Sequence, residues 1–165
     1  MISRDLTILH ADFANRVAKV RADLKQRSIP LEVFEGFRSA ERQAKLYAQG
    51  RTLPGNVVTK AKPWSSFHQY GLAVDFALKI RGVWSWDSSR ENMGHWRSLH
   101  AIGEEYGLRA LSWELAHLEF ADTSSGLLSN GAYPPGGGKI WAATLRQAIK
   151  DYPLGAPRPP MASLA

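Results

Sequence analysis

Hydrophobic residues near the N-terminus recur at steps of three and four, which is the spacing of one face of an α-helix. These residues are Leu6, Leu9, Phe13, Val17, Val20 and Leu24. The pattern predicts a long amphipathic helix over residues 5–26 that packs on a core, with Ser3 as its N-cap. His10 lies on this helix, and we expect it to be structural or solvated.

Three further segments have the composition and boundaries of helices. Ser39 can cap a helix over residues 40–49, which a glycine follows directly. The other two segments are residues 93–106, again followed by a glycine, and residues 140–149. The chain therefore carries predicted helices at its start, middle and end.

Short segments between these helices have the character of strands. Residues 29–34 are rich in β-branched side chains, and residues 72–78 alternate between two faces. Residues 79–87 resemble a hairpin, and residues 108–111 and 116–121 predict two more strands. We predict an α+β fold in which helices flank a small antiparallel sheet.

The loops and the C-terminal end mark the limits of this fold. Residues 51–64 and 122–138 contain several glycines and prolines and predict irregular loops. Four of the nine prolines lie within residues 153–160. We therefore predict a single domain over residues 1–152 and a proline-rich tail over residues 153–165.

Composition narrows the kinds of site that the chain can build. A chain of 165 residues can bury a core without disulfides, and it has no cysteine, so a metal site must use histidine and carboxylate ligands. The net charge of +6 and the pI near 9.8 favour an anionic partner such as nucleic acid, a membrane surface or a cell-wall polymer. Basic residues form no run of five or more, so nucleic-acid binding would rest on charge alone.

The N-terminal residues do not resemble an export signal. Residues 1–6 are not followed by an apolar stretch of signal-peptide length, because Asp12, Asn15 and Arg16 interrupt it. No segment approaches the roughly 20 apolar residues of a membrane span. We expect a protein that is made in the cytoplasm without a signal peptide and does not bind a membrane.

Residues 66–75 contain the ligand types of a metal site. His68 ends a predicted loop, and Gly71 allows a tight turn because it has no Cβ. Asp75 lies on the small-residue face of the next strand, which we expect to be open to the site. His117 lies further along the chain. Two histidines and one carboxylate, with a fourth position open, are a ligand set of catalytic zinc.

Other residues near these ligands have the chemistry of a hydrolase. Glu114 precedes His117 by three residues and is a candidate base, since zinc lowers the pKa of water to about 7 and a carboxylate must carry its proton to the leaving group. Arg38 lies in a predicted turn and can grip a substrate carboxylate with two hydrogen bonds. Glu119 shares strand parity with His117 and is a candidate partner for that imidazole. Spacing alone leaves open that His68 and His117 are structural or surface histidines.

Several motifs together resemble one family of zinc peptidases. They are Gly36-Phe37-Arg38-Ser39, Gln43, Leu46-Tyr47, Gly50-Arg51, Val58-Thr59-Lys60-Ala61, Ser66-x-His68-x-x-Gly71-x-Ala73-x-Asp75-Phe76, Ile102-Gly103-x-x-x-Gly107-Leu108 and Trp113-Glu114-x-x-His117-x-Glu119. The family includes bacteriophage L-alanyl-D-glutamate endolysins, D-alanyl-D-alanine carboxypeptidases and D-Ala-D-Ala dipeptidases. The resemblance covers roughly residues 30–120, and the motif between Ser66 and Asp75 is specific.

The resemblance implies roles for individual residues. It implies one Zn²⁺ per chain, bound by His68, Asp75 and His117. It also implies that Glu114 is the catalytic base. The residues expected to meet the substrate are Arg38, which would also act in catalysis, Ser66 and Gln43.

Two segments differ from the endolysins that this chain resembles. Those endolysins carry Asp-x-Pro-His where this chain has Glu114-Leu115-Ala116-His117, and a glutamate there is similar to the dipeptidase pattern. Residues 109–113 replace a Gly-Gly-Asp-Trp segment. Both differences concern which bond is cleaved rather than the metal ligands.

The resemblance implies a peptidoglycan peptidase. We expect an antimicrobial, phage-type endolysin that acts as a monomer, hydrolyses the L-alanyl-D-glutamate bond of the murein stem peptide and lyses the bacterial cell. It would stay in the host cytoplasm until a holin releases it to the periplasmic wall. The alternatives are a D,D-carboxypeptidase or dipeptidase acting on D-Ala-D-Ala, and a non-catalytic zinc-stabilised murein-binding module. The presence of Glu114 argues against the last.

Overall fold

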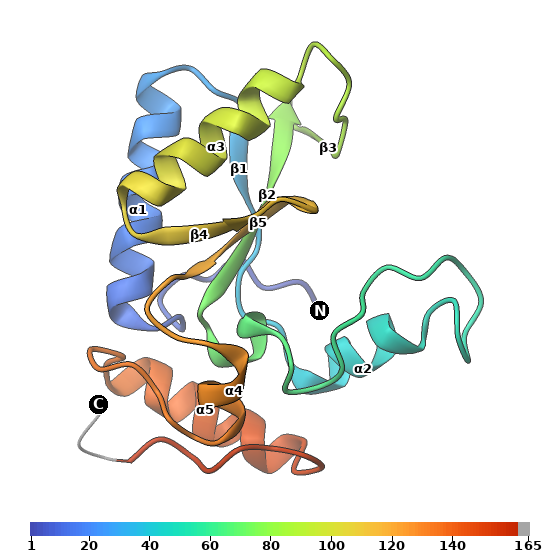
Figure 1. Cartoon of the computed structure of the whole chain (residues 1–165), viewed down its shortest axis with the longest axis vertical. Helices are drawn as coiled ribbons and strands as arrows, with labels where there is room; N and C mark the ends of the chain where they lie inside the picture. The colour runs from blue at the N-terminus through green and yellow to red at the C-terminus, as the bar shows by residue number, and fades with distance from the viewer. Residues whose placement is uncertain (162–165) are drawn as a thin grey trace.

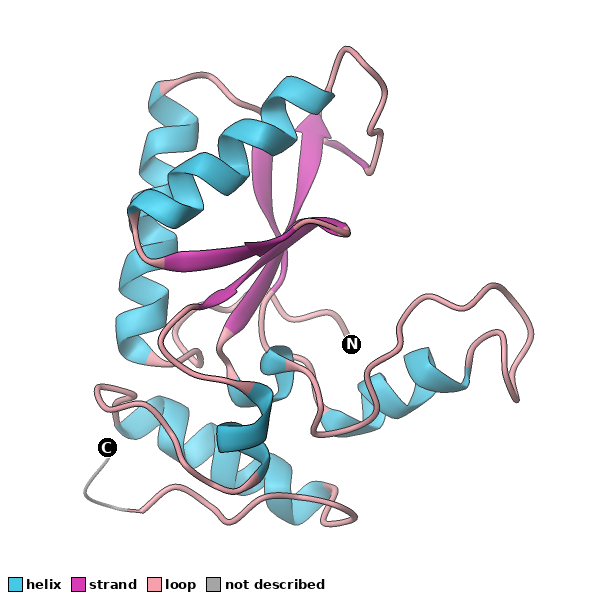
Figure 2. Cartoon of the chain, viewed as in Figure 1, coloured by secondary structure: helices cyan, strands magenta, loops and turns pink. Residues whose placement is uncertain are grey.

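A computed structural model describes residues 1–161. Within this part of the chain, five strands form one antiparallel sheet. Four strands lie in the order β1 (Leu31–Glu35), β2 (Ala73–Ile80), β5 (Glu114–Phe120) and β4 (Leu108–Leu111), and β3 (Val83–Ser85) also pairs with β2. Helices flank the sheet (Figures 1 and 2). The predicted α+β class and antiparallel sheet are confirmed.

The helices cover different parts of this sheet. α1 (Ala11–Gln26) and α3 (Met93–Glu105) lie side by side, and α3 packs on β4 and β5 (Figure 1). α5 (Lys139–Asp151) packs against the short 3₁₀ helix η1 (Phe67–Tyr70). α2 (Ala40–Ala48) and the loop that follows it project to one side of the molecule.

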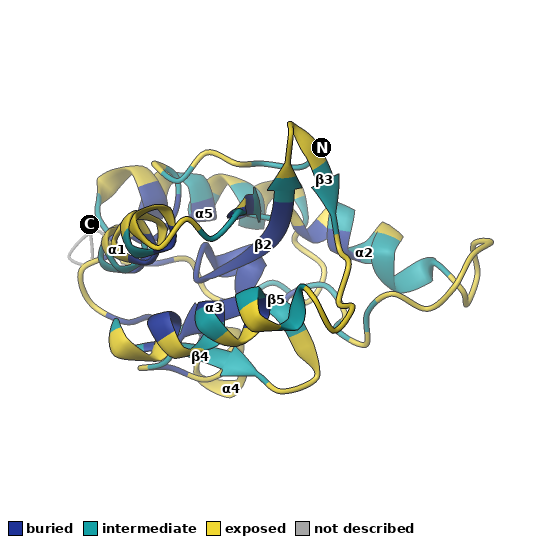
Figure 3. Cartoon of the chain, turned by 90° about the horizontal axis from the view of Figure 1, so that it is seen from above, coloured by how far each residue is buried: buried dark blue, intermediate teal, exposed yellow. Residues whose placement is uncertain are grey.

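The core surrounds β2, which is buried along most of its length (Figure 3). Four apolar residues of α1 are buried against it, as their spacing predicted: Phe13, Val17, Val20 and Leu24. The expectation that the Asp75 face of β2 is open to the site holds only for Asp75, which lines a cavity, because Asp75 and the alanines beside it are otherwise buried. β2 is a central strand, and η1 and the Arg38 side chain cover the face that carries Asp75.

Gly71 joins η1 to β2 in a conformation that favours glycine. Its φ is +65°, in the left-handed region, and a Cβ there would lie 3.2 Å from Trp141 Cδ1 and 3.3 Å from Leu9 Cα. Trp141 Nε1 also donates a hydrogen bond of 2.7 Å to Tyr70 O. The turn therefore fixes His68, three residues earlier, relative to β2.

The first helix is shorter than predicted. α1 begins at Ala11, and residues 5–7 form a turn in which Thr7 N donates to Asp5 Oδ1 at 2.9 Å. The first two N–H groups of the helix donate to the carbonyls of residues 136–137, so Ser3 does not cap it. His10 is buried, and its Nε2 lies 3.2 Å from Pro134 O.

Other boundaries agree closely with prediction, apart from two missed short helices, of which η1 is one. Ser39 caps α2 by accepting a hydrogen bond of 3.2 Å from Arg42 N. The predicted loop over residues 122–138 contains a short helix, α4 (Ser125–Ser129), because Ser124 accepts a hydrogen bond from Leu127 N.

The proline-rich segment lies against the rest of the chain. Tyr133 donates a hydrogen bond to Arg158 O, and Arg146 Nη1 donates to Pro160 O at 3.2 Å. The division at residue 152 stays a prediction, and residues 162–165 lie outside the described part. Between residues 1 and 161, no helix is both long and apolar enough to cross a membrane.

Candidate metal centre and active site

Three segments bring His68, Asp75 and His117 together. β2 and β5 are neighbouring antiparallel strands, and Asp75 and His117 face each other in their register. η1 carries His68 over this strand pair. A capping box between Ser66 and Gln69 stabilises the start of η1. Gly71, in the left-handed conformation, ends η1 and leads into β2. The backbone of η1 is also tied to the turn after β1, since Arg38 N donates to His68 O at 3.1 Å.

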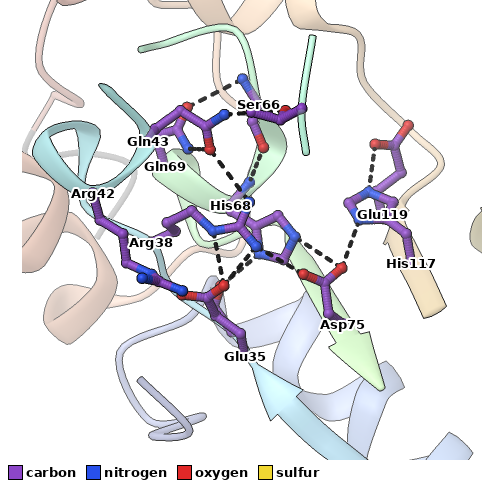
Figure 4. A network of polar contacts seen from close by, with 12 residues as sticks. Glu35, Arg38, Arg42, Gln43, Ser66, His68, Gln69, Asp75, His117 and Glu119 are labelled. Carbon is purple, nitrogen blue, oxygen red and sulfur yellow. Dashed lines mark hydrogen bonds and ion pairs between the residues drawn. The ribbon is translucent and has the colours of Figure 1, made fainter. Parts of the chain in front are cut away.

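The side chains of these three residues converge on one point (Figure 4). Asp75 Oδ1 lies 3.2 Å from His68 Nε2 and 3.1 Å from His117 Nδ1. One ligand atom from each residue lies within 4.8 Å of the others, and all three residues are buried. They therefore form a group that could hold a metal ion, at the positions that the sequence predicted.

The hydrogen bonds of His68 suit a metal ligand. Its Nδ1 lies 2.7 Å from Gly36 O, so this nitrogen carries the proton in the neutral ring and donates it to that carbonyl. Nε2 then carries a lone pair, and within residues 1–161 it makes no hydrogen bond although it is buried. Two lone pairs, on Nε2 and on Asp75 Oδ1, therefore face each other. A cation shared between them would satisfy both.

The electrostatics of His117 also favour a cation. Its Nδ1 faces Asp75, and its Nε2 lies 3.0 Å from Glu119 Oε2. Burial lowers the pKa of His117, but hydrogen bonds to Asp75 and Glu119 outweigh this effect and raise the pKa to about 10. The carboxylates that draw a proton to this imidazole would attract a metal ion in the same way.

Asp75 is ionised in this environment. Burial by itself raises the pKa of its carboxyl group, but its interactions with the imidazoles of His68 and His117 hold the pKa well below its usual value. Arg38 Nη2 donates to Asp75 Oδ2 at 2.8 Å. One carboxylate oxygen thus faces the histidines while the other is held by a guanidinium.

Glu119 orients His117 through its far nitrogen. Arg109, which is opposite Glu119 in the β4–β5 register, donates to Glu119 Oε1 from Nε at 2.9 Å and from Nη2 at 2.7 Å. Burial raises the pKa of Glu119, and the interactions with His117 and Arg109 more than offset this and lower it. A carboxylate on the second nitrogen fixes the orientation of a ligand imidazole. Strand parity predicted Glu119, but nothing in the sequence pointed to Arg109.

Arg38 lies beside the ligands, but most of its donors are already used. Its Nε and Nη2 donate to Glu35 Oε2 at 2.9 and 2.6 Å, Nη2 donates to Asp75, and Nη1 donates to Gln43 Oε1 at 3.3 Å. A guanidinium has five N–H groups, so one remains for another partner. The two-bond grip on a substrate carboxylate that we expected is therefore not available in this arrangement.

Glu35 and Arg42, which the sequence reasoning missed, complete this network (Figure 4). Glu35 is 2% exposed, and its Oε1 accepts a hydrogen bond of 2.6 Å from Arg42 Nε. Glu35 shares the inward face of β1 with Leu31 and Val33, and this parity was a signal for it, since a buried carboxylate requires partners.

Gln43 lies behind Arg38 rather than at an open surface. It is fully buried, and its Nε2 donates to Ala61 O at 2.7 Å. Its Oε1 accepts from Arg38 and from Gln69 Nε2, the latter at 3.2 Å. Gln43 thus joins Arg38, η1 and the loop before it into one unit.

Two cavities meet at the candidate metal centre. The larger, of about 1080 Å³, is lined by His68, His117, Ser66, Lys60 and Arg109 among others, and we call it the basic cavity. The smaller, of about 450 Å³, is lined by Asp75, Phe34, Trp86, Trp96 and Ser88 among others, and we call it the aromatic cavity. The residues that line both are Arg38, Val58, Thr59, Trp113 and Glu114.

Glu114 lies at the junction of the two cavities. It is the first residue of β5, three residues before His117, and its side chain is exposed. A carboxylate in this position can exchange protons with groups in either cavity. Ser66 lines the basic cavity, and its hydroxyl oxygen lies 3.4 Å from His68 N.

The sequence profile of a known family matches most of this chain. The family is described as VanY: D-alanyl-D-alanine carboxypeptidase, and the match covers residues 7–115. The chain belongs to the VanY family. The match includes His68, Asp75 and Glu114 and ends two residues before His117, which the structure brings to the same point. The zinc dependence of this family agrees with the donor set at the site.

A curated protein is similar to this chain over part of its sequence. It is named peptidoglycan L-alanyl-D-glutamate endopeptidase CwlK, from Bacillus subtilis (strain 168), and is 35% identical over 104 residues. The aligned region is 60% of this chain and 62% of CwlK, so the chain spans less than two thirds of that relative.

Two solved structures have the same fold. The L,D-carboxypeptidase DacB from Streptococcus pneumonia has a TM-score of 0.52 and 23% identity, over 68% of this chain and 66% of DacB. The LD-carboxypeptidase LdcB has a TM-score of 0.56 and 18% identity, over 86% of this chain and 68% of LdcB. At these identities the likeness concerns the fold alone.

Proposed function

We propose that this protein is a zinc-dependent peptidoglycan peptidase that hydrolyses the L-alanyl-D-glutamate bond of the murein stem peptide. The observation that carries the proposal is the buried group of His68, Asp75 and His117 at the junction of two cavities. Membership of the VanY family and the 35% identity to a protein named L-alanyl-D-glutamate endopeptidase support it.

The residues of the site would divide the work of hydrolysis. His68, Asp75 and His117 would hold the zinc, which would supply Lewis-acid chemistry that activates water at neutral pH. Glu114 accepts the proton of the attacking water on its carboxylate and delivers it to the nitrogen of the departing D-glutamate as the C–N bond breaks. Arg38 and Ser66 line the same space and orient the substrate, Arg38 through its one remaining N–H.

Gln43 and Glu35 would act one layer further back. Neither side chain is exposed enough to bind substrate, and both hold Arg38 against Asp75. We therefore propose a positioning role for Gln43 instead of direct substrate binding.

The cleavage product tests the proposal. Purified murein is digested with the zinc-loaded protein, and the new termini are identified by mass spectrometry. We expect free L-alanine carboxyl groups and free D-glutamate amines, and we expect a chelator to stop their formation. Murein that stays intact with the zinc-loaded protein would overturn the assignment as a peptidase.

A D,D-carboxypeptidase is the second candidate. The description of the VanY family names D-alanyl-D-alanine carboxypeptidase, and this chain has glutamate rather than aspartate at position 114. The same digestion separates the two reactions, because a D,D-carboxypeptidase releases D-alanine from pentapeptide stems.

We further propose that the protein acts as a phage-type lysis enzyme that a holin releases to the cell wall. The net charge of +6 suits attraction to anionic murein. The chain is expressed in a Gram-negative host with and without a holin, and turbidity is followed. Lysis is expected only when the holin is present or the inner membrane is permeabilised. Lysis without either would contradict a role that depends on release.

A further inference from the structure

The aromatic cavity opens directly onto the reacting centre but has no assigned ligand. Arg38, Asp75 and Glu114 are among the residues that line it. Its lining also includes two indoles that are unusually exposed for their size, Trp86 at 51% and Trp113 at 79%. Large exposed aromatic side chains beside a cavity mark a surface that binds something.

Trp86 is held in place from behind. Phe34 packs edge-on against it, with the ring centroids 4.9 Å apart and the planes at 76°. Phe34 also packs against Trp84, and the Arg4 guanidinium lies 5.1 Å from the Phe34 ring centroid. This support leaves one side of the Trp86 indole available as a flat apolar surface. Trp113 lies just before β5 and lines the same cavity.

The charges in the aromatic cavity are nearly balanced, unlike those of an anion site. Glu35 pairs with both Arg38 and Arg42, and Arg38 also pairs with Asp75. No lysine lines this cavity, whereas Lys60 lines the basic cavity. Ser88 and Thr59 add neutral hydrogen-bonding groups. A ligand with an apolar face and neutral polar edges fits this lining best.

We propose that the aromatic cavity binds an N-acetylhexosamine ring of the glycan strand, next to the scissile bond. The C–H face of such a ring can lie on an indole, while its hydroxyl and acetamido groups meet Ser88 and Thr59. The stem-peptide carboxylates, starting with D-glutamate, would then extend into the basic cavity toward Lys60. The inference rests on the proposed function. It places the sugar end of the substrate in the aromatic cavity and the peptide end in the basic cavity.

Substrate chemistry links this binding site to the choice of bond. In murein the N-acetylmuramic acid is attached to L-alanine, so a single residue separates the sugar from an L-alanyl-D-glutamate bond. Four residues, or roughly 13 Å of extended chain, separate it from a D-alanyl-D-alanine bond. A sugar site that borders Asp75 and Glu114 can be filled only in the first case.

Two matched substrates test the inference. One is N-acetylmuramoyl-L-Ala-D-Glu-diaminopimelic acid, and the other is the same tripeptide with an acetyl group in place of the sugar. We expect the zinc-loaded protein to cleave the sugar-bearing substrate with a kcat/KM about tenfold higher. Trp86→Ala is expected to reduce this ratio toward one, and Trp86→Phe to keep most of it. Val83→Ala, exposed on β3 outside both cavities, is the control and should keep the ratio.

A binding measurement gives a second readout that does not depend on turnover. Saturation-transfer NMR with the product N-acetylmuramoyl-L-alanine should show the strongest transfer to the sugar-ring protons, and Trp86→Ala should weaken it. Circular dichroism checks that each variant is folded. The wild-type ratio and the wild-type NMR result stand even if Trp86→Ala does not fold.

The possible results separate this inference from the proposed function. Equal cleavage of both substrates at the L-Ala–D-Glu bond, without transfer to the sugar, overturns the sugar site and leaves the proposed function intact. No cleavage of either substrate together with no sugar binding overturns both. Release of D-alanine from pentapeptides, with no cleavage at L-alanine, also overturns the sugar site.

Discussion

Glu35 illustrates how single residues maintain the charge of this site. Burial raises the pKa of its carboxyl group, but hydrogen bonds from Arg42 and Arg38 outweigh that effect and lower the pKa. The ionised carboxylate holds Arg38, and Arg38 holds the outer oxygen of Asp75. Glu35, which lies opposite Asp75 in the β1–β2 register and is not one of the three candidate ligands, thus helps to fix the orientation of Asp75.

Glu114 belongs to the proposed catalytic residues, and its replacement tests that role. Glu114→Gln should bind zinc normally, because Glu114 is not among the three ligands. It should reduce kcat by about 10²- to 10⁴-fold, since a positioned proton carrier contributes that much. Metal analysis and murein digestion measure the two properties. A variant that keeps zinc and digests murein as fast as the wild type would rule Glu114 out.

The protonation of His117 predicts how zinc binding depends on pH. The pKa of His117 rises from an ordinary 6.5 to about 10 in the folded, metal-free protein. This stabilisation of the fold is complete below the lower value and is lost as the pH rises through the higher one.

Zinc must displace that proton, so we expect about one proton to be released per zinc bound at pH values between these two. Titration calorimetry in buffers of different ionisation enthalpy measures the release. Zinc uptake without proton release would show that His117 is neutral before binding.

At the scale of elements, the turn between η1 and β2 determines the spacing of two ligands. η1 carries His68, β2 carries Asp75, and Gly71 joins them with a positive φ and close neighbours. The pairing of β2 with β5 then brings His117 opposite Asp75. The accuracy of the site depends on this turn and on this strand register.

Gly71→Ala tests the importance of the turn. A Cβ in the left-handed region costs about 1–2 kcal/mol, and the contacts with Trp141 and Leu9 add to this, so the free energy of unfolding should fall by at least that amount. Gly94→Ala is the control: Gly94 lies in α3 with open space around its Cβ position, and the change should be neutral or stabilising by up to about 1 kcal/mol. Urea unfolding compares the two. Equal stability of the two variants would contradict the role of Gly71.

At the scale of the whole molecule, the candidate metal centre connects both edges of the sheet to η1 and α2. Its ligands come from η1, β2 and β5, and the network behind it reaches β1, α2 and β4. An ion bound only by the folded chain would therefore stabilise the entire domain.

Zinc removal should lower the melting temperature. Zinc at about 100 times its Kd stabilises a folded protein by about 2.7 kcal/mol. For a domain of this size, that corresponds to a rise in Tm of about 5–10 °C. A chelator should therefore lower the Tm of the wild type by this amount and leave His68→Ala unchanged. His95→Ala, a histidine outside the group, should respond like the wild type. An unchanged wild-type Tm would argue against a bound metal ion.

The sequence by itself determined the elements and the candidate ligands of this protein. Hydrophobic periodicity and capping residues placed most helices and strands, since these patterns act over a few neighbouring residues. The spacing within residues 66–75, together with His117 and Glu114, indicated the site. The start of α1 and the short helices η1 and α4 were missed, because contacts between distant loops and short capped turns decide them.

Only the tertiary structure decided how these residues are used. The partners of Arg38, the support of Glu119 by Arg109, and the burial of both faces of β2 depend on strand order and register. The division of the site into a basic and an aromatic cavity depends on loops that meet only in the folded chain. The physical reason is that side chains far apart in sequence become neighbours only when the sheet closes around them.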